Sequence, residues 1–276
     1  VGNLDKVEFV KESIRNEEIV EKLIKKHDIV IHAAALADVG ACVRNPEIEF
    51  KTNVAGTQNI LESCQKNNIE KFVFVSSAAV YGLGNRSVFK ETDPCFPVSN
   101  YALSKYWGEQ QTRLYYELYN LPTTSIRFFS VYGSPQIPKK GSHSWAVAIF
   151  GALAKKGKPI TVFGDGNQIR DFTHVSDIAE SVVLSTEKES TNGKFFNVGT
   201  GKPTKINDIV EKIFQHVKPV PINYKPYPPG DPIGGYSDTT LMKKLLDWEP
   251  QITLDQGIKE YFEWLNNHEH IIPEWI

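Results

Sequence analysis

Apolar residues in the first half of the chain alternate between short continuous runs and stretches with helical spacing. We predict strands at 7–10, 29–32, 72–75 and 124–129, and helices at 17–26, 47–67 and 100–119. Continuous apolar strands separated by helices are typical of a parallel sheet that is covered on both faces. The pattern therefore predicts an α/β fold built on a doubly wound parallel sheet.

The second half has shorter elements, and proline and glycine become frequent after about residue 130. We expect helices near 145–155, 176–186, 206–216 and 255–266, strands at 160–163 and 195–198, and a proline-rich loop at 219–235. This change of texture predicts one domain over 1–130, to which 171–200 return, and a smaller α+β domain over most of 131–276.

A candidate site lies where the predicted elements meet. Tyr101 precedes Lys105 by four residues, so both side chains lie on one face of a helix. A nearby ammonium favours the phenolate, so we expect Lys105 to lower the pKa of Tyr101 and make it a general base. The hydroxyls of Ser76 and Ser77 end the preceding strand, at the edge where open α/β sheets bind ligands.

Composition and charge exclude several classes of partner. The 276 residues carry a net charge of −2, with a pI of about 6.4, so bulk electrostatics predict neither a nucleic-acid nor a membrane partner. Three scattered cysteines give neither metal-ligand spacing nor a disulfide framework, and they favour a reducing, cytoplasmic compartment. The longest apolar stretches are too short to cross a bilayer.

Motifs in a fixed order carry a resemblance to a known family. The chain resembles the extended short-chain dehydrogenases/reductases, specifically the NAD-dependent nucleotide-sugar epimerases of the UDP-glucose 4-epimerase type. The matching segments span nearly the whole chain: His32-Ala-Ala-Ala35, Asn53-Val-Ala-Gly-Thr-Gln-Asn59, Val75-Ser-Ser-Ala-Ala-Val-Tyr-Gly82, Tyr101 with Lys105, Arg127-Phe-Phe-Ser-Val-Tyr-Gly133, Gly164-Asp-Gly166, Arg170-Asp-Phe-Thr-His-Val-x-Asp177, Phe196-Asn-Val-Gly-Thr-Gly201 and Pro229-Gly-Asp231.

The resemblance implies catalytic roles for three residues. Tyr101 would take the proton from the sugar 4-hydroxyl while hydride leaves C4 for NAD. Lys105 would bind the nicotinamide ribose and tune Tyr101, and Ser77 would hydrogen-bond the same hydroxyl or help relay its proton. The 4-keto sugar would then turn over and receive the hydride on its other face, so NAD is regenerated.

The resemblance also implies the binding residues of a Rossmann-like dinucleotide-binding domain and of a substrate domain. Besides Tyr101 and Lys105, the cofactor would contact Ser13, Ile14, Ala33, Ala34, Ala35, Asn53, Ser76 and Phe128. The nucleotide sugar would contact Ser77, Ser130, Val162, Arg170, Asp231 and Gly235. Arg170 would pair with the diphosphate, for which a guanidinium is well shaped. Its alternative is a salt bridge to Asp171 or Asp177.

The chain also departs from the family pattern. The family opens with a strand, a GxxGxxG turn and a helix that holds the pyrophosphate, and this N-terminal β-α-β unit does not precede the first matching segment, so we expect a truncated form with weak dinucleotide binding. Ser13-Ile14 replaces an Asp-Leu or Asp-Ile pair, Ser130 stands where many members carry Asn, and Pro228 stands where a phosphate-binding Arg is common.

Two further positions discriminate between reactions. A 4,6-dehydratase needs an acid and a base where this chain has Ala78 and Ala79, so dehydration is disfavoured. Gly235 aligns with a bulky residue that restricts the sugar C2 substituent in some epimerases, so UDP-N-acetylhexosamines as well as UDP-hexoses are expected substrates.

Other functions remain open. The alternatives to a 4-epimerase are a nucleotide-sugar reductase or decarboxylase of the same fold, and a catalytically silent binding protein. The family packs the helices that carry Asn53 and Tyr101 into a dimer interface, so the resemblance also implies a homodimer.

Overall fold

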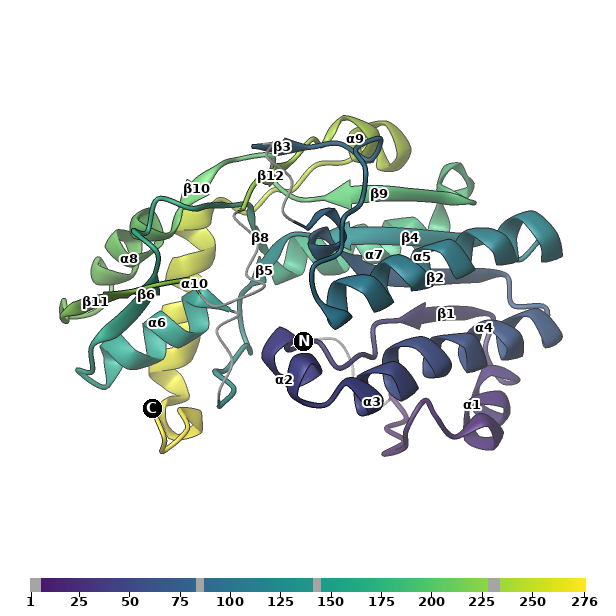
Figure 1. Ribbon diagram of the computed structural model, residues 1–276, viewed down its shortest axis with the longest axis horizontal. Helices are drawn as coiled ribbons and strands as arrows, with labels where there is room; N and C mark the ends of the chain where they lie inside the picture. Colours follow the sequence, from purple (N-terminus) through teal and green to yellow (C-terminus); the bar gives the residue numbers. More distant parts are fainter. Residues whose placement is uncertain (1–5, 83–86, 141–144, 228–233) are drawn as a thin grey trace.

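A four-stranded parallel sheet organises one half of the molecule, on the right in Figure 1. The computed structural model describes residues 6–82, 87–140, 145–227 and 234–276. The sheet has the order β1-β2-β4-β9, with β1 (Ile29–His32), β2 (Lys71–Ser77), β4 (Thr123–Phe128) and β9 (Lys194–Val198). All its neighbouring strands pair in parallel, which confirms the predicted α/β class.

Helices cover both faces of this sheet because β2 is apolar on both sides. Phe72 and Phe74 pack against α1 (Glu17–Ile24), α4 (Gly56–Lys66) and α5 (Asn100–Tyr119). Val73 points to the other face and joins a cluster with α7 (Val175–Glu187) and α9 (Thr240–Leu246). Successive side chains of a strand face opposite sides, so a run without polar residues requires this double cover.

A second apolar core lies among the C-terminal elements, on the left in Figure 1. It joins α6 (Ala146–Lys155), α8 (Ile206–Phe214) and α10 (Leu254–Asn267) to β6 (Ile160–Phe163), which pairs with β11 (Ile222–Lys225). The remaining elements are α2 (Val39–Arg44), α3 (Pro46–Glu49), η2 (Phe50–Ala55), η3 (Ala78–Tyr81), β3 (Val88–Phe89), β5 (Ser130–Tyr132), β7 (Ile169–Arg170), β8 (Phe172–His174), η4 (Glu189–Thr191), β10 (Thr204–Lys205), β12 (Tyr236–Ser237) and η5 (Glu269–Ile271).

Most predicted elements are confirmed with small changes at their ends. The helix predicted at 47–67 is split, because η2 is a π-helical turn between α3 and α4. The stretch predicted as a loop at 219–235 contains β11, which adds to β6. The strand predicted at 7–10 is wrong: these residues form no regular structure.

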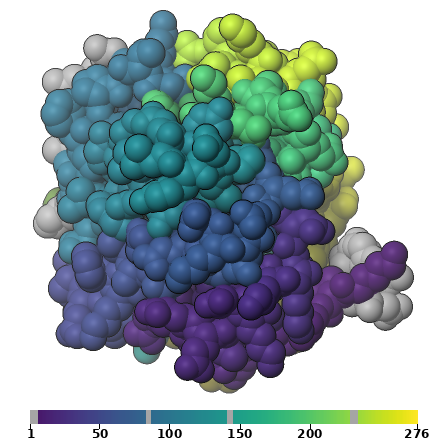
Figure 2. All heavy atoms as spheres, turned by 90° about the vertical axis from the view of Figure 1, so that its right-hand side faces the viewer, coloured from purple at the N-terminus to yellow at the C-terminus, as the bar shows by residue number. Residues whose placement is uncertain are grey.

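Residues 7–10 form no strand because they pair with no neighbour among the described residues. A strand needs a hydrogen-bonded neighbour, and this segment pairs with neither β1 nor β9, the two edge strands of the sheet. Ile29 and Ile31 of β1 are 43% and 47% exposed, and Phe9 is 85% exposed. Figure 2 shows the purple N-terminal segment projecting from the body of the molecule.

The described residues also bear on disulfides and membranes. Cys42, Cys64 and Cys95 are free thiols, which agrees with the prediction of no disulfide framework. Among the helices of the described chain, none combines the length and apolar character that a bilayer crossing demands.

Candidate active site

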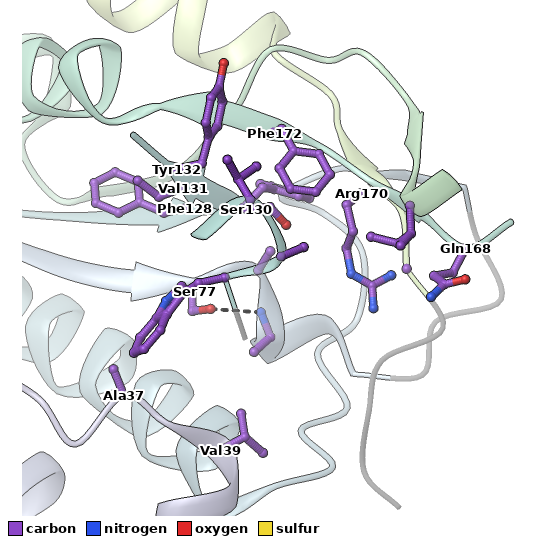
Figure 3. A pocket seen from close by; sticks show the side chains of 18 of the residues that line it. Ala37, Val39, Ser77, Phe128, Ser130, Val131, Tyr132, Gln168, Arg170 and Phe172 are labelled. Atoms are coloured by element: carbon purple, nitrogen blue, oxygen red, sulfur yellow. Dashed lines mark hydrogen bonds between the residues drawn. The ribbon is translucent and has the colours of Figure 1, made fainter. Parts of the chain in front are cut away.

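A cavity of about 680 Å³ opens beside the carboxyl ends of β2 and β4 and extends towards the C-terminal elements (Figure 3). Strands of a parallel sheet end at a common edge, so residues from distant parts of the sequence meet there. The cavity wall contains these predicted site residues: Ser76, Ser77, Tyr101, Phe128, Ser130, Arg170 and Gly235. Ala78 and Ala79 also line it, with methyl groups at the positions where a dehydratase needs an acid and a base.

Tyr101 and Ser77 meet at this wall. Ser99 caps α5 by accepting a hydrogen bond from the Ala102 N–H, which places Tyr101 in the first turn of the helix. Ser77 is the last residue of β2 and is hydrogen-bonded to Tyr101 through its side chain. Its Oγ also accepts the N–H of Ala79 at 3.2 Å, the dashed line in Figure 3. The hydroxyl groups of Ser77 and Tyr101 are therefore held at the carboxyl end of β2.

Lys105 lies one turn further along α5 and is 3% exposed. Its Nζ donates to the carbonyl oxygen of Val75 at 2.7 Å and lies 6.0 Å from the centroid of the Tyr101 ring. Burial lowers the pKa of Lys105 to about 8, while Glu109 and Glu49 act in the opposite direction. The Lys105 ammonium is thus hydrogen-bonded to β2, the strand that ends at Ser77.

The predicted lowering of the Tyr101 pKa is contradicted. Burial raises the pKa of Tyr101 above its ordinary value, and the hydrogen bond with Ser77 only partly offsets this effect. Desolvation penalises the phenolate, and the Lys105 ammonium is engaged by a backbone carbonyl rather than by the phenol.

His32 is a neutral neighbour of Lys105. Burial, followed by the charge of Lys105, lowers its pKa to about 3. Thr57 Oγ1 gives its own proton to the Asn53 carbonyl, so it accepts at 2.9 Å from His32 Nε2. Nδ1 is then a buried acceptor, for which no partner occurs among the described residues.

The residues predicted to contact the cofactor fall into two groups. Ala33, Ala34 and Ala35 follow β1 and are at least partly exposed, so their small side chains leave the strand end open. Phe128 and Ser76 reach the cavity wall, although the Ser76 hydroxyl donates to Glu109 at 2.5 Å.

The other predicted cofactor residues lie away from the cavity wall. The Asn53 amide binds both the N–H and the carbonyl of Leu36, at 2.8 and 3.1 Å, and so fixes the loop after β1. Ser13 is exposed, and Ile14 packs so closely on α4 that a Cβ on Gly56 would lie 2.7 Å from it.

Arg170 and Ser130 face the cavity from β7 and β5 (Figure 3). The Ser130 N–H donates to the backbone oxygen of Asp171 at 2.8 Å. The Asp171 carboxylate, predicted as an alternative partner of Arg170, accepts from both the N–H and the hydroxyl of Thr200 and of Ser237, and from the Gly201 N–H. Asp171 therefore ties the segment that carries Arg170 to the loop at Thr200 and Gly201 and to β12.

Other predicted substrate residues are placed differently. Val162 is fully buried in the C-terminal core, and its neighbours Thr161 and Phe163 line the cavity instead, because side chains alternate along β6. Gly235 lines the cavity with φ +155°, and a Cβ built on it would lie 2.3 Å from Phe89. Asp231 and Pro228 lie outside the described residues.

Sequence reasoning missed the role of Asp171 and several cavity residues, among them Trp145 and Gln168. Asp171 could have been found, because it lies inside the Arg170-Asp-Phe-Thr-His174 motif. Trp145 and Gln168 carry no local pattern that separates them from ordinary loop residues.

The family model described as the NAD dependent epimerase/dehydratase family matches residues 1–199. The chain belongs to this family. As a family member it is an NAD-dependent enzyme, and its parallel sheet is the Rossmann fold of related epimerase structures, such as the Thermotoga maritima UDP-glucose 4-epimerase, which it matches with a TM-score of 0.88.

Similar members differ in the reactions that their names state. The chain is 37% identical over 267 residues to a putative UDP-glucose 4-epimerase of Methanocaldococcus jannaschii, covering 95% of this chain and 85% of the relative. It is 30% identical to a UDP-N-acetyl-alpha-D-glucosaminuronate decarboxylase of Bacillus cytotoxicus, with 94% and 83% covered. A UDP-glucuronic acid 4-epimerase structure from Bacillus cereus, in complex with UDP-glucuronic acid and NAD, matches with 28% identity, a TM-score of 0.86, and 95% and 82% covered.

The residues of this epimerase-family member fit the nicotinamide end of NAD. A tyrosine and a strand-end serine meet at the cavity wall, a buried lysine lies behind the tyrosine, and partly or fully exposed alanines follow the neighbouring strand. A glycine-rich phosphate turn between a strand and a helix is not found in the part of the chain that the structure describes.

Proposed function

We propose that the chain is a nucleotide-sugar 4-epimerase that inverts C4 of a UDP-hexose or a UDP-N-acetylhexosamine. The observation that carries this proposal is that Ser77 and Tyr101 line the same cavity wall, with alanines at the two positions after Ser77. Such a pair can remove a proton from a hydroxyl, whereas Ala78 and Ala79 cannot supply the acid and base of a dehydration.

Each residue has a defined task in this mechanism. Tyr101 takes the proton of the sugar 4-hydroxyl, and Ser77 hydrogen-bonds the same oxygen and orients it. The charge of Lys105 stabilises the Tyr101 phenolate that accepts this proton. Bound NAD supplies a reversible hydride acceptor. Tyr101 returns the proton after the 4-keto sugar has turned over.

Substrate binding is assigned to the opposite wall of the cavity. Arg170 is proposed to bind the diphosphate, and Ser130 to bind the sugar nucleotide where many relatives use Asn. Gly235 brings no side chain to the wall, which supports acceptance of an N-acetyl group. In this proposal, residues 1–130 with 171–200 bind the cofactor, and most of 131–276 binds the substrate.

We also propose a homodimer formed through the outer faces of α4 and α5. Leu103 and Leu118 lie 15 residues apart, close to four helical turns, and are 59% and 64% exposed on α5. Phe50, next to α4, is 58% exposed. Leu103→Asp should convert a dimer to monomers in sedimentation equilibrium, whereas a wild-type chain that sediments as a monomer contradicts the dimer.

Product analysis tests the reaction. The chain is incubated with NAD and, separately, UDP-glucose, UDP-glucuronate or UDP-N-acetylglucosamine, and the products are resolved by NMR. A C4-inverted sugar without net NADH formation supports the proposal. Release of CO₂ from UDP-glucuronate would instead identify a decarboxylase, the activity in the name of the Bacillus cytotoxicus relative. Net NADH would identify an oxidoreductase.

A further inference from the structure

A buried ion pair lies next to the proposed catalytic residues. Glu109 follows Lys105 by one turn on α5, and Arg127 extends from β4. Arg127 Nε and Nη2 donate to the two carboxylate oxygens of Glu109 at 2.8 and 2.7 Å. Both side chains are at most 2% exposed. A hydrophobic pair of similar volume is often as stable as a buried ion pair, so stability alone does not account for this one.

The pair connects α5 to a row of residues across three strands. Ser76, Arg127 and Asn197 are register partners on β2, β4 and β9. Ser76 Oγ donates to Glu109, while Arg127 Nη1 donates at 2.9 Å to Tyr81 Oη. Tyr81 Oη in turn donates to Asn197 Oδ1 at 2.7 Å. Glu109 thus fixes the helix to β2 and β4 at neighbouring positions of the sheet.

Lys105 and Glu109 bind consecutive residues of β2. Lys105 Nζ donates to the Val75 carbonyl, and the carboxylate of Glu109 accepts from Ser76. Residues four apart on a helix share one face, so Tyr101, Lys105 and Glu109 form a single line along α5. A displacement of Glu109 would therefore carry Lys105 and Tyr101 with it, away from Ser77.

The charges around Lys105 come from several elements. Glu109 lies on its own helix and Glu49 on α3, and both favour the ammonium against the effect of burial. His32 on β1 is neutral, because its pKa is lowered to about 3. Tyr101 faces Lys105 from the first turn of α5. Glu109 is therefore one of two anions that keep the ammonium charged.

We propose that Glu109 is a positioning residue: held between Arg127 and Ser76, its carboxylate keeps α5 in register with β2 and so holds Lys105 next to Tyr101. This inference rests on the proposed function, since it takes Tyr101 and Lys105 as the reacting pair. Glu109 itself does not touch the substrate, because its oxygens are occupied by Ser76 and Arg127.

The first variant is Glu109→Gln, which preserves shape and removes the charge. We expect kcat for C4 inversion to fall on the order of 10- to 100-fold with KM changed by less than about threefold, because misplacement of a reacting group is costly while substrate binding is untouched. In the nucleotide-free protein, ¹⁵N NMR of the lysine side chains, assigned with Lys105→Met, should show a lower Lys105 pKa. This titration needs no substrate, so it stands even where the substrate assignment fails.

A second variant separates positioning from support of the fold. Glu109→Gln combined with Arg127→Met removes the uncompensated buried charge and should recover the melting temperature. If Glu109 acts by positioning, kcat and the Lys105 pKa stay low in this double variant. If both recover together with the melting temperature, the proposal is overturned. Glu117→Gln is the matched control, because Glu117 pairs with Arg113 on the exposed end of the same helix, and its kcat should be unchanged.

If the Glu109→Gln variant does not fold, the Ser76→Ala variant tests the positioning role of Glu109 instead. It removes one hydrogen bond from the carboxylate and leaves the ion pair with Arg127 in place. A several-fold lower kcat with an unchanged KM supports the proposal, and a kcat equal to that of the wild type overturns it.

Discussion

Ser77, the last residue of β2, shares its hydroxyl between Tyr101 in the first turn of α5 and the backbone N–H of Ala79. Ser77 and Ala79 belong to one short segment, whereas Tyr101 lies more than 20 residues further along the chain. The Ala79 N–H occupies a lone pair of Ser77 Oγ and thereby fixes the side chain. Ser77 is consequently oriented before any substrate arrives, which is the property that a proton-transfer site requires.

Removal of the Tyr101 hydroxyl should strongly lower kcat while substrate binding persists. We expect Tyr101→Phe to lower kcat by about 10²- to 10⁴-fold, the usual contribution of a general base, with a much smaller change in KM. Steady-state kinetics with the active UDP-sugar measure this. Tyr119→Phe, at the exposed end of the same helix, is the control and should retain full activity. Comparable activity of Tyr101→Phe and the wild type would remove Tyr101 from the mechanism.

The raised pKa of Tyr101 predicts a neutral phenol at physiological pH in the nucleotide-free protein. Its ultraviolet phenolate absorption, taken as the difference between wild type and Tyr101→Phe, should appear only above the ordinary value of about 10. Since the ionised form is the base, kcat/KM should rise with pH across the neutral range. A Tyr101 phenolate signal below pH 9 in the nucleotide-free protein would contradict the dominance of burial.

The sequence predicted the central sheet and the meeting of Ser77 with Tyr101, because both follow from local patterns. Apolar runs between helices specify a parallel sheet, and the carboxyl ends of its strands share one edge. Ser130 and Arg170 line the same cavity, but their places in it were predicted from the family resemblance rather than from local patterns.

The rest depends on contacts that no local pattern records. Residues 7–10 have a strand-like composition, but a strand forms only where a neighbour accepts its hydrogen bonds. Val162 was misplaced by one residue because the parity of a strand is set by packing rather than by composition. The direction of the Tyr101 pKa depends on how deeply the phenol is buried, which the spacing of Tyr101 and Lys105 does not reveal.

Arg170 should govern binding rather than chemistry. A hydrogen bond to a charged group contributes about 1.5–3 kcal/mol, so Arg170→Ala should raise KM for the UDP-sugar about 10- to 100-fold, with kcat nearly unchanged. Arg170→Lys should recover part of this loss, because an ammonium keeps the charge without the planar fork. Isothermal titration with UDP measures the binding step alone. Equal affinity of wild type and Arg170→Ala for UDP would place the diphosphate elsewhere.

Asp171 should be critical for stability and, through it, for the shape of the substrate wall. Its fully buried carboxylate accepts five hydrogen bonds from three residues, of which Thr200 and Gly201 lie in one loop and Ser237 lies in β12. Asp171→Asn replaces one acceptor oxygen with a donor, so we expect a loss of about 3 kcal/mol in the free energy of unfolding by urea. Asp165→Asn, in an exposed turn, is the control and should stay within about 0.5 kcal/mol of the wild type. Equal stability of the two variants would show that the hydrogen bonds to the Asp171 carboxylate are not needed to hold these segments together.

Any side chain introduced at position 235 should clash with the ring of Phe89. A Cβ there would lie 2.3 Å from the Phe89 ring, and φ +155° is a conformation that residues with side chains rarely adopt. Phe89 cannot retreat, since its ring stacks on Tyr81 with centroids 4.7 Å apart and an interplanar angle of 16°. We expect Gly235→Ala to lower the free energy of unfolding by about 1–3 kcal/mol, and Phe89→Leu to recover part of that loss in the double variant. Urea unfolding of the four proteins completes the cycle. Additive effects of the two changes would mean that backbone strain, rather than the contact with Phe89, excludes a side chain at this wall.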